Sequence, residues 1–133
     1  MIKAFIIFCF LIVQFFGFLI FANAETNILR YALCKSNVAQ TRVVGHDNNF
    51  SVIINLSQSS VEEFKNITAK NVGKRLTIVI DDAIITSAII ESEIDSGVIA
   101  SSQMTETDAK NLQQRILNAS EKPCGLVIQQ SGP

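Results

Sequence analysis

A short apolar run, set between a glycine and a pair of aspartates, restricts the fold of this chain more than any other segment. Residues 76–80 read Leu-Thr-Ile-Val-Ile, with Leu and both Ile on one face of an extended strand and Thr and Val on the other. Because both faces are largely apolar, the run predicts a central strand that is covered on at least one side. Gly73 precedes it, where a helix C-cap needs positive φ. Asp81-Asp82 follows it and predicts a turn.

The first 24 residues predict a signal peptide or an N-terminal membrane anchor. Lys3 gives a weakly basic start, and residues 4–22 are almost wholly apolar. Ala22-Asn23-Ala24 supplies the small residues of a signal-peptidase site, which predicts cleavage between Ala24 and Glu25. The apolar run is also close to the ~20 residues that span a bilayer, so an uncleaved anchor is the alternative. In either case we expect the remaining chain to be exported, either to the periplasm or as a secreted protein.

Residues 25–133 have the length of a single domain with one modest core. They carry ten Lys and Arg against twelve Asp and Glu, which gives a formal charge of −2. The basic residues are scattered apart from Lys74-Arg75, so the sequence lacks the basic stripe that binds nucleic acid. The sequence shows no second hydrophobic span, so we expect membrane contact only if the N-terminal segment stays uncleaved.

Two cysteines lie in the predicted domain, Cys34 and Cys124, while Cys9 lies in the N-terminal apolar run. Disulfides persist in an oxidising compartment, so this even pair favours a disulfide that closes most of the domain into one loop. Two buried free thiols are the alternative. The pair lacks the CxxC spacing, and the single histidine, His46, is distant from both. We therefore expect neither a metal nor a cofactor.

The remaining pattern intersperses strands with two helices. Strict alternation at 50–56 predicts a strand, and the polar residues 36–49 predict a loop. Ser60 with Glu63 fits a capping box for the first helix, and Thr105 fits the start of the second. Further strands are expected at 27–35, 83–93, 98–101 and 125–129. The simplest arrangement is an α+β fold, a mixed β-sheet with two helices packed on one face.

The acidic residues and the histidine do not suggest a catalytic site. Glu62-Glu63 fits a helix N-terminus, Asp81-Asp82 fits a turn, and the acidic residues of 91–95 fit an exposed strand face. His46 falls in the predicted loop with no nucleophile near it in sequence. GxSxG, P-loop and HExxH patterns do not occur. The sequence therefore predicts a protein that is not an enzyme.

Several segments, taken in order, resemble the head subdomain of the large periplasmic domain of SecD. Residues 71–82 read NVGKRLTIVIDD and residues 85–90 read ITSAII, where that family shows a comparable NVGKRLAIVLDG-x-V-x-SAP-x-I run. Residues 104–112, MTETDAKNL, resemble the family's FT-x-EEA-x-x-LA helix start. The strand at 50–56 falls where the family has VSF-x-L. The resemblance covers about residues 49–118.

The chain departs from the family pattern at three places. Asp82 stands where the family has glycine, Ile89 stands where it has proline, and its glycine-rich turn is reduced to Gly97. SecD itself carries many membrane spans that use the proton gradient to assist preprotein export, and this sequence shows no such span after residue 22. It resembles a free-standing, signal-bearing version of the head, so proton-driven activity is not implied.

The resemblance implies a non-enzymatic periplasmic module that binds a protein partner, as an accessory to protein export or envelope assembly. The partner would be an exported polypeptide or a component of the envelope or translocon. Contact is expected through an exposed strand edge or the loop at 95–103, since edge pairing uses backbone groups and needs no side-chain motif. The alternatives are a secreted enzyme or inhibitor with a site built from loops, and a purely structural domain.

Overall fold

The computed structural model describes residues 28–128. The predicted signal peptide or anchor, residues 1–24, lies outside the described residues, together with its cleavage point between Ala24 and Glu25. Residue 129, the end of the predicted last strand, also lies outside them. Within the described part of the chain, no helix has the length and apolar character needed to cross a membrane.

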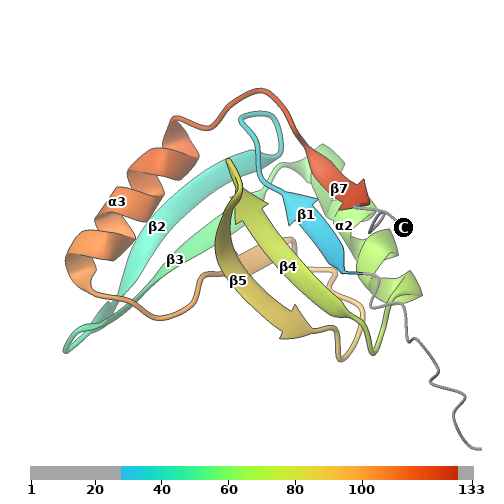
Figure 1. Ribbon diagram of the computed structural model, residues 1–133, viewed down its shortest axis with the longest axis horizontal. Coiled ribbons are helices and arrows are strands. Elements are labelled where there is room, and N and C mark those ends of the chain that lie inside the picture. Colours follow the sequence, from blue (N-terminus) through green and yellow to red (C-terminus); the bar gives the residue numbers. More distant parts are fainter. Residues whose placement is uncertain (1–27, 129–133) are drawn as a thin grey trace, which may run out of the picture.

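Four strands form a mixed sheet (Figure 1). They are β1 (Leu29–Ala32), β4 (Arg75–Ile80), β5 (Ala83–Ile89) and β7 (Gly125–Ile128). Their order is β5-β4-β1-β7. β1 runs parallel to β4, whereas β1–β7 and β4–β5 are antiparallel pairs. β4 and β1 therefore lie in the centre of this sheet, and β5 and β7 are its edges.

Three further strands form a separate antiparallel sheet: β2 (Val38–His46), β3 (Asn49–Leu56) and β6 (Val98–Ala100). Their order is β2-β3-β6. β2 and β3 make a long hairpin, and the short β6 pairs with residues 53–55 of β3. The strands that the sequence suggested as one sheet are thus divided between two, each with its own edges.

The two helices, α2 (Gln58–Lys70) and α3 (Glu106–Leu117), lie against different sheets. α3 packs across β2 and β3, whereas α2 lies beside β1 and β7 (Figure 1). Phe64 of α2 meets Tyr31 of β1 edge to face, with ring centroids 5.0 Å apart. The predicted α+β class is confirmed.

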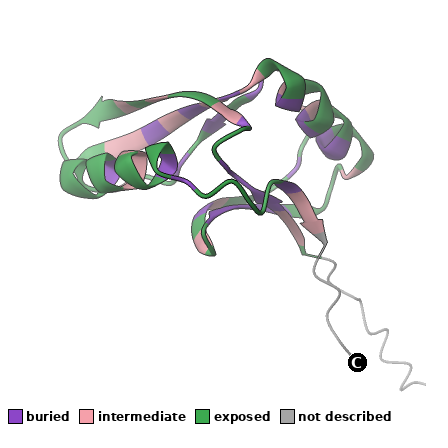
Figure 2. Cartoon of the chain, turned by 90° about the horizontal axis from the view of Figure 1, so that it is seen from above, coloured by how far each residue is buried: buried purple, intermediate pink, exposed green. Residues whose placement is uncertain are grey.

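The core is built around β4, whose residues 76–80 are all buried, as the apolar run predicted. Figure 2 shows the buried residues gathered in the strands and on parts of both helices, with exposed residues along the outer sides. The largest fully buried side chains come from both sheets and both helices: Tyr31, Phe64, Ile54, Ile80 and Ile116. One continuous apolar core therefore joins the two sheets.

Two hairpins turn on pairs of residues with positive φ. Asp81 and Asp82, with φ of 43° and 66°, join β4 to β5 and confirm the predicted turn. Asp47 and Asn48, with φ of 48° and 64°, join β2 to β3. Consecutive positive φ values are typical of type I′ turns, whose twist matches that of the flanking strands. Asp and Asn tolerate this conformation better than other side-chain-bearing residues.

The prediction of a loop over residues 36–49 is wrong for most of its length. β2 occupies Val38–His46, and the loop signal at 45–49 belongs to a two-residue turn. β2 is an edge strand whose side chains are mostly exposed, while Val38 and Val43 pack against the core. No residue of β2 is fully buried, and its sequence VAQTRVVGH shows neither an apolar run nor strict alternation, so nothing in it marks a strand.

One of the two predicted helix starts is confirmed. The Asp108 N–H donates to Thr105 Oγ1 at 3.2 Å, which caps α3. α2 begins at Gln58 after Ser57, so the capping box predicted for Ser60 and Glu63 is wrong. Ser60 instead lies in the first turn, where its hydroxyl accepts a hydrogen bond from the hydroxyl of Ser57 at 3.1 Å.

The exit from α2 confirms the positive φ expected at Gly73, which is 87°. The helix itself ends at Lys70 with Asn71 as C-cap, so Gly73 turns the chain into β4 rather than capping the helix. Its N–H donates to the carbonyl of Ile90 at 2.7 Å. This bond fixes the end of β5 beside the start of β4.

Candidate functional site

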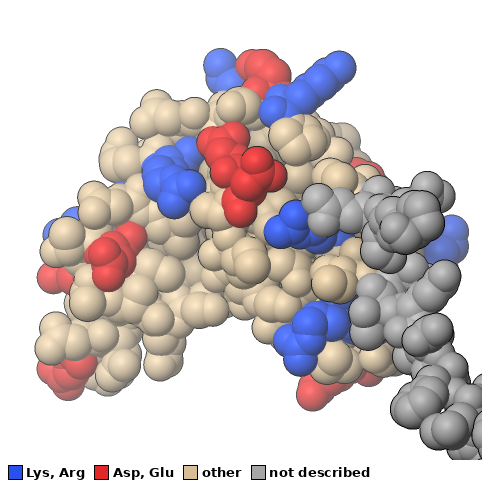
Figure 3. Space-filling model, in the orientation of Figure 1, with Lys and Arg blue, Asp and Glu red and all other residues tan. Residues whose placement is uncertain are grey.

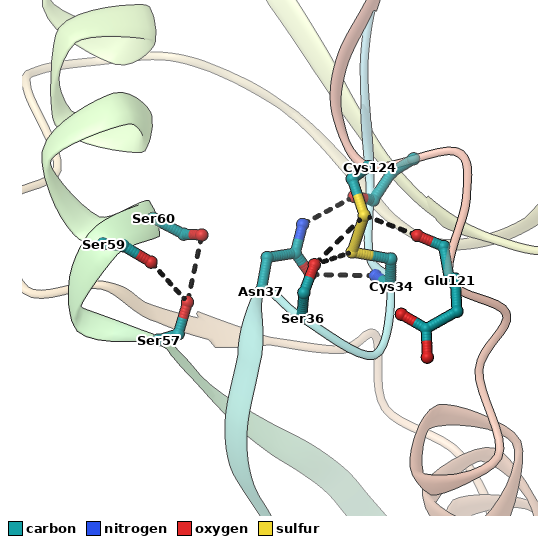
Figure 4. Close-up of a disulfide and its surroundings, with 9 residues drawn as sticks. Cys34, Ser36, Asn37, Ser57, Ser59, Ser60, Glu121 and Cys124 are labelled. Atoms are coloured by element: carbon teal, nitrogen blue, oxygen red, sulfur yellow. Dashed lines mark hydrogen bonds between the residues drawn. A yellow bond between two sulfur atoms is a disulfide. The ribbon is translucent and has the colours of Figure 1, made fainter.

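The two cysteines of the predicted domain are joined by a disulfide (Figure 4). Cys34 is buried just after β1, and Cys124 is exposed just before β7. Since Ala32 pairs with Gly125 across the β1–β7 ladder, the bond fastens one end of that ladder. The hydroxyl oxygen of Ser36 lies 3.2 Å from Cys34 Sγ and 3.4 Å from Cys124 Sγ. Of the two alternatives the sequence left open, the structure shows the disulfide.

A buried amide supports the chain beside this disulfide. The Cys34 N–H donates to Asn37 Oδ1 at 2.8 Å, and Asn37 Nδ2 donates to the carbonyl of Ala32 at 2.9 Å (Figure 4). The Asn37 carbonyl accepts from the N–H of Ser57 at 2.8 Å, which ties this turn to the start of α2. Sequence reasoning missed Asn37, because its role depends on contacts with both neighbouring segments.

Tyr31 is a core residue whose pKa is raised above its ordinary value. Its side chain is fully buried, and no hydrogen-bond partner for the hydroxyl is present among the described residues. Burial raises the pKa of Tyr31 to about 12, and the negative charge of Glu63 adds to the rise. Ser60 and Asn37 are polar neighbours that oppose it, but neither makes a well-aligned hydrogen bond to the hydroxyl. This tyrosine is a core residue outside the cleft described below.

The acidic residues and the histidine weighed as sites do not converge. Glu62 and Glu63 are exposed and lie beyond the first turn of α2, so the placement predicted for them at the helix N-terminus is wrong. His46 is exposed at the end of β2. In residues 28–128, no three His, Cys, Asp or Glu side chains are placed to hold a metal ion. Figure 3 shows the charges of one face in small separate groups.

An open apolar cleft lies between the two sheets. Its volume is about 700 Å³, and its lining comes from β4, β5, β6 and α2 and from Ile90, Glu91, Ser92 and Ile94. The apolar side chains that line it include Phe64, Leu76, Ile78, Ala88, Ile94 and Ile99. Among its lining residues Glu91 carries the formal charge.

The cleft separates the edge strands of the two sheets, since β5 ends one strand order and β6 ends the other. The edges meet at one point, where the Ser102 N–H donates to the carbonyl of Ile85 at 3.2 Å. Two large apolar side chains of the cleft lining remain exposed, Ile89 at 46% and Val98 at 44%. The site is thus a wedge between two unpaired strand edges.

The segment 95–103, expected to make a contact, contains β6 where the sequence predicted a strand at 98–101, and its accessible part borders the cleft. Val98 and Ala100 are exposed, whereas Ser101 is buried and its hydroxyl accepts the N–H of Val52 at 2.9 Å. Gly97 has φ of 64°, and a Cβ there would lie 2.5 Å from a methyl of Val61 in α2. Glycine therefore lets this turn pack directly on the helix.

The fold and the site define a small two-sheet α+β domain with an apolar cleft between strand edges. The family model described as SecDF, P1 head subdomain, matches residues 30–120, and the chain belongs to this family. The family suggested by the sequence is thereby confirmed. The match reaches beyond residues 49–118 to include most of β1 and all of β2.

Two solved structures share this fold. One is the structure of a membrane component SecDF that enhances protein export, with a TM-score of 0.59, 21% identity and coverage of 74% of this chain and 46% of the solved chain. The other is a crystal structure of SecDF in a super-membrane-facing form, with a TM-score of 0.58, 21% identity and coverage of 72% and 13%. The chain thus spans less than half of either solved chain. No curated protein sequence matches it.

Proposed function

We propose that this chain is a non-enzymatic, extracytoplasmic module that binds a protein partner as an accessory to protein export or envelope assembly. The observation that carries the proposal is the apolar cleft between the unpaired edges of β5 and β6. The partner is an exported polypeptide or a component of the envelope or translocon. The family supports the direction of the proposal, since a related structure is that of a SecDF that enhances protein export.

The cleft has the properties of a surface that binds a polypeptide. Unpaired strand edges present N–H and C=O groups that can pair with another chain. Removing the apolar lining from water on binding would stabilise the complex by roughly 25 cal/mol per Å² of buried apolar surface. Ile89 and Val98 at its margin are large apolar side chains that remain about half exposed. Neither feature depends on a particular side-chain motif, in keeping with recognition of varied sequences.

The enzyme alternative has less support in the cleft itself. The site would then be expected to bring together a shifted acid or base and a polar partner. His46 does not line the cleft, and Tyr31, which has a raised pKa, lies in the core. The lining is mainly apolar with Glu91 as its charged member.

The proposed compartment is the periplasm or the cell exterior, reached through the predicted signal at residues 1–24. The disulfide between Cys34 and Cys124 supports it, because such bonds persist in oxidising compartments. Contact with a membrane would come from residues 1–24 if they remain uncleaved. We propose no nucleic-acid partner and no cofactor.

Crosslinking in intact cells tests the function. A photoreactive side chain would replace Val98, which is exposed and lines the cleft, and adducts would be identified by mass spectrometry. Leu117 on α3 is the matched control, because it is apolar, 56% exposed and outside the cleft. We expect adducts with exported chains or translocon components from position 98 but not from position 117. Equal labelling from both positions, or none from position 98, would contradict the proposal.

A further inference from the structure

The peptide groups of β6 that point away from its own sheet can be identified from the hydrogen bonds around it. The Leu56 N–H donates to the carbonyl of Gly97, and the Ser101 N–H donates to that of Val52. In an antiparallel ladder, hydrogen-bonded pairs alternate with non-bonded pairs. Val98 and Ala100 therefore belong to non-bonded pairs, and their N–H and C=O groups point away from β3.

The same counting applies to β5. The Ile90 N–H donates to the carbonyl of Lys74, which places residue 90 in a bonded position. Ile89 and Ser87 therefore turn their peptide groups away from β4. The bond from the Ser102 N–H to the carbonyl of Ile85 agrees, since residue 85 has the same outward parity.

The bond between Ile85 and Ser102 gives a starting point from which a register for the two rows of outward groups can be counted. Counting from the Ile85–Ser102 bond in an antiparallel sense places Ser87 opposite Ala100 and Ile89 opposite Val98. Among the described residues no ladder joins β5 to β6, and the cleft lies between them. Apart from the bond between Ser102 and Ile85, the outward groups of one edge are therefore not paired with those of the other. The Val98 N–H donates to Ser96 Oγ at 3.2 Å, so an incoming strand would have to replace this bond.

We propose that the cleft accepts one extended segment of unfolded polypeptide as a strand between β5 and β6, which joins the two sheets into one. This inference rests on the proposed function and specifies the form in which the partner binds. One strand takes up roughly 4.8 Å on each side in a sheet, so a single chain can pair with both edges at once. It would run parallel to one edge and antiparallel to the other. A segment of about five residues would cover the facing positions.

The apolar lining of the cleft determines which side chains a bound segment needs. Phe64, Leu76 and Ile99 lie on the inner side of the cleft, which joins the apolar core. Successive side chains of a strand point to opposite faces, so every second residue would meet this apolar surface and the others would face solvent. The partner is therefore a segment with apolar side chains at alternate positions.

Charge adds a preference at one end of the cleft. Glu91 lies among the lining residues, two positions beyond the end of β5, whereas Glu93 is outside the lining and forms an exposed ion pair with Lys65 at 3.9 Å. A lysine or arginine that follows or precedes the apolar positions would reach the carboxylate of Glu91. The recognised chemistry is thus an alternating apolar strand with a basic residue at its Glu91 end.

Binding of synthetic peptides to the full chain tests strand insertion. The probe is a fluorescent peptide of alternating valine and threonine with lysine at one end, and binding is followed by fluorescence anisotropy. A second peptide carries N-methyl groups on the threonine amides, which removes hydrogen-bond donors and leaves the side chains unchanged. We expect N-methylation to weaken binding by about tenfold or more, because several backbone hydrogen bonds are lost. A glutamate in place of the lysine should weaken it as well.

A variant of the protein makes the same test from the other side. Ala100→Pro removes an outward N–H that the β3 ladder does not use, and proline is tolerated at such edge positions. Ala100→Ser is the matched control, since it keeps the N–H and a small side chain. We expect the proline variant to bind the unmodified peptide about tenfold less tightly and the serine variant to bind it normally. The methylated peptide still decides the question if the proline variant fails to fold.

The outcomes of these experiments distinguish strand insertion from the proposed protein-binding function on which it rests. Equal affinity for the plain and methylated peptides would overturn strand insertion and leave the cleft as an apolar protein-binding surface. Failure to bind either peptide, together with specific crosslinks from position 98, would also overturn insertion but not the function. Failure of both experiments would overturn both. Equal binding of the lysine and glutamate peptides would remove the assigned role of Glu91.

Discussion

Tyr31 combines a large apolar contact with a polar group that the fold leaves without a partner. Its ring packs against Phe64 in the centre of the core, while its hydroxyl is buried with no hydrogen-bond partner among the described residues. A buried hydroxyl in this state costs stability relative to a hydrogen atom in the same place. The contribution of this residue to the fold therefore comes from the ring.

We expect Tyr31→Phe to leave the free energy of unfolding near pH 8 unchanged or to raise it by about 1 kcal/mol. At high pH the two chains should diverge. The folded pKa of Tyr31, about 12, lies above its ordinary value of 10, so the unfolded chain loses this proton first. The wild type therefore keeps its full stability below about pH 10 and loses roughly 2–3 kcal/mol relative to Tyr31→Phe between about pH 10 and 12.

Denaturant unfolding of both chains across this pH range measures the difference. The titration of lysines is common to the two proteins and cancels in the comparison. A difference between wild type and Tyr31→Phe that stays constant up to about pH 12 would show that the hydroxyl is not held neutral by the fold.

Residues whose role follows from the local pattern could be predicted from the sequence, and those whose role depends on tertiary contacts could not. Asp81-Asp82 as a turn and Gly73 with positive φ are confirmed, because backbone preference alone decides them. Asn37 was missed, since an asparagine in a polar stretch gives no sign that its amide bridges two buried backbone groups.

At the scale of elements, the most buried strand was the easiest to predict from the sequence and the most exposed strand was missed. β4 is buried on both faces and was predicted from its apolar run. No residue of β2 is fully buried, and its segment was predicted to be a loop. β6 has only three residues, and the sequence predicted it as a strand at 98–101. The start of α3 was predicted correctly because the Thr105 hydroxyl caps it. The start of α2 was not, because α2 has no side-chain cap.

The element that depends most on a single covalent bond is β7. It has four residues, lies at the edge of the mixed sheet and follows Cys124 directly. The disulfide to Cys34 spans 90 residues of sequence, so it removes much of the freedom of the unfolded chain. The chain-entropy model assigns such a bond roughly 4–5 kcal/mol.

We expect Cys124→Ala to lower the free energy of unfolding by about that amount. Cys124 is exposed, so the change removes the bond without opening a cavity in the core. Urea unfolding with and without a thiol reductant provides the control, since reductant should destabilise the wild type and leave the variant unchanged. Equal stability of the oxidised wild type and the variant would contradict this role for the disulfide.

At the scale of the whole molecule, the division into two sheets creates the candidate site. The sequence predicted the α+β class, the family and a contact at a strand edge or at residues 95–103. It did not indicate that β5 and β6 are edges of different sheets, because alternation places a residue on a face but says nothing about which strand lies next to it. The cleft is lined by residues of both edges, which are joined by the bond between Ser102 and Ile85.

Hydrogen–deuterium exchange of the full chain, with and without the alternating valine–threonine peptide, tests the central claim most directly. The account predicts that bound peptide slows exchange at the outward amides of both edges, namely Ser87, Ile89 and Ala100. Exchange in β2, an edge strand away from the cleft, should stay unchanged. Protection confined to β2 or β7, or no protection at either side of the cleft, would contradict the claim that a polypeptide binds between the two sheets.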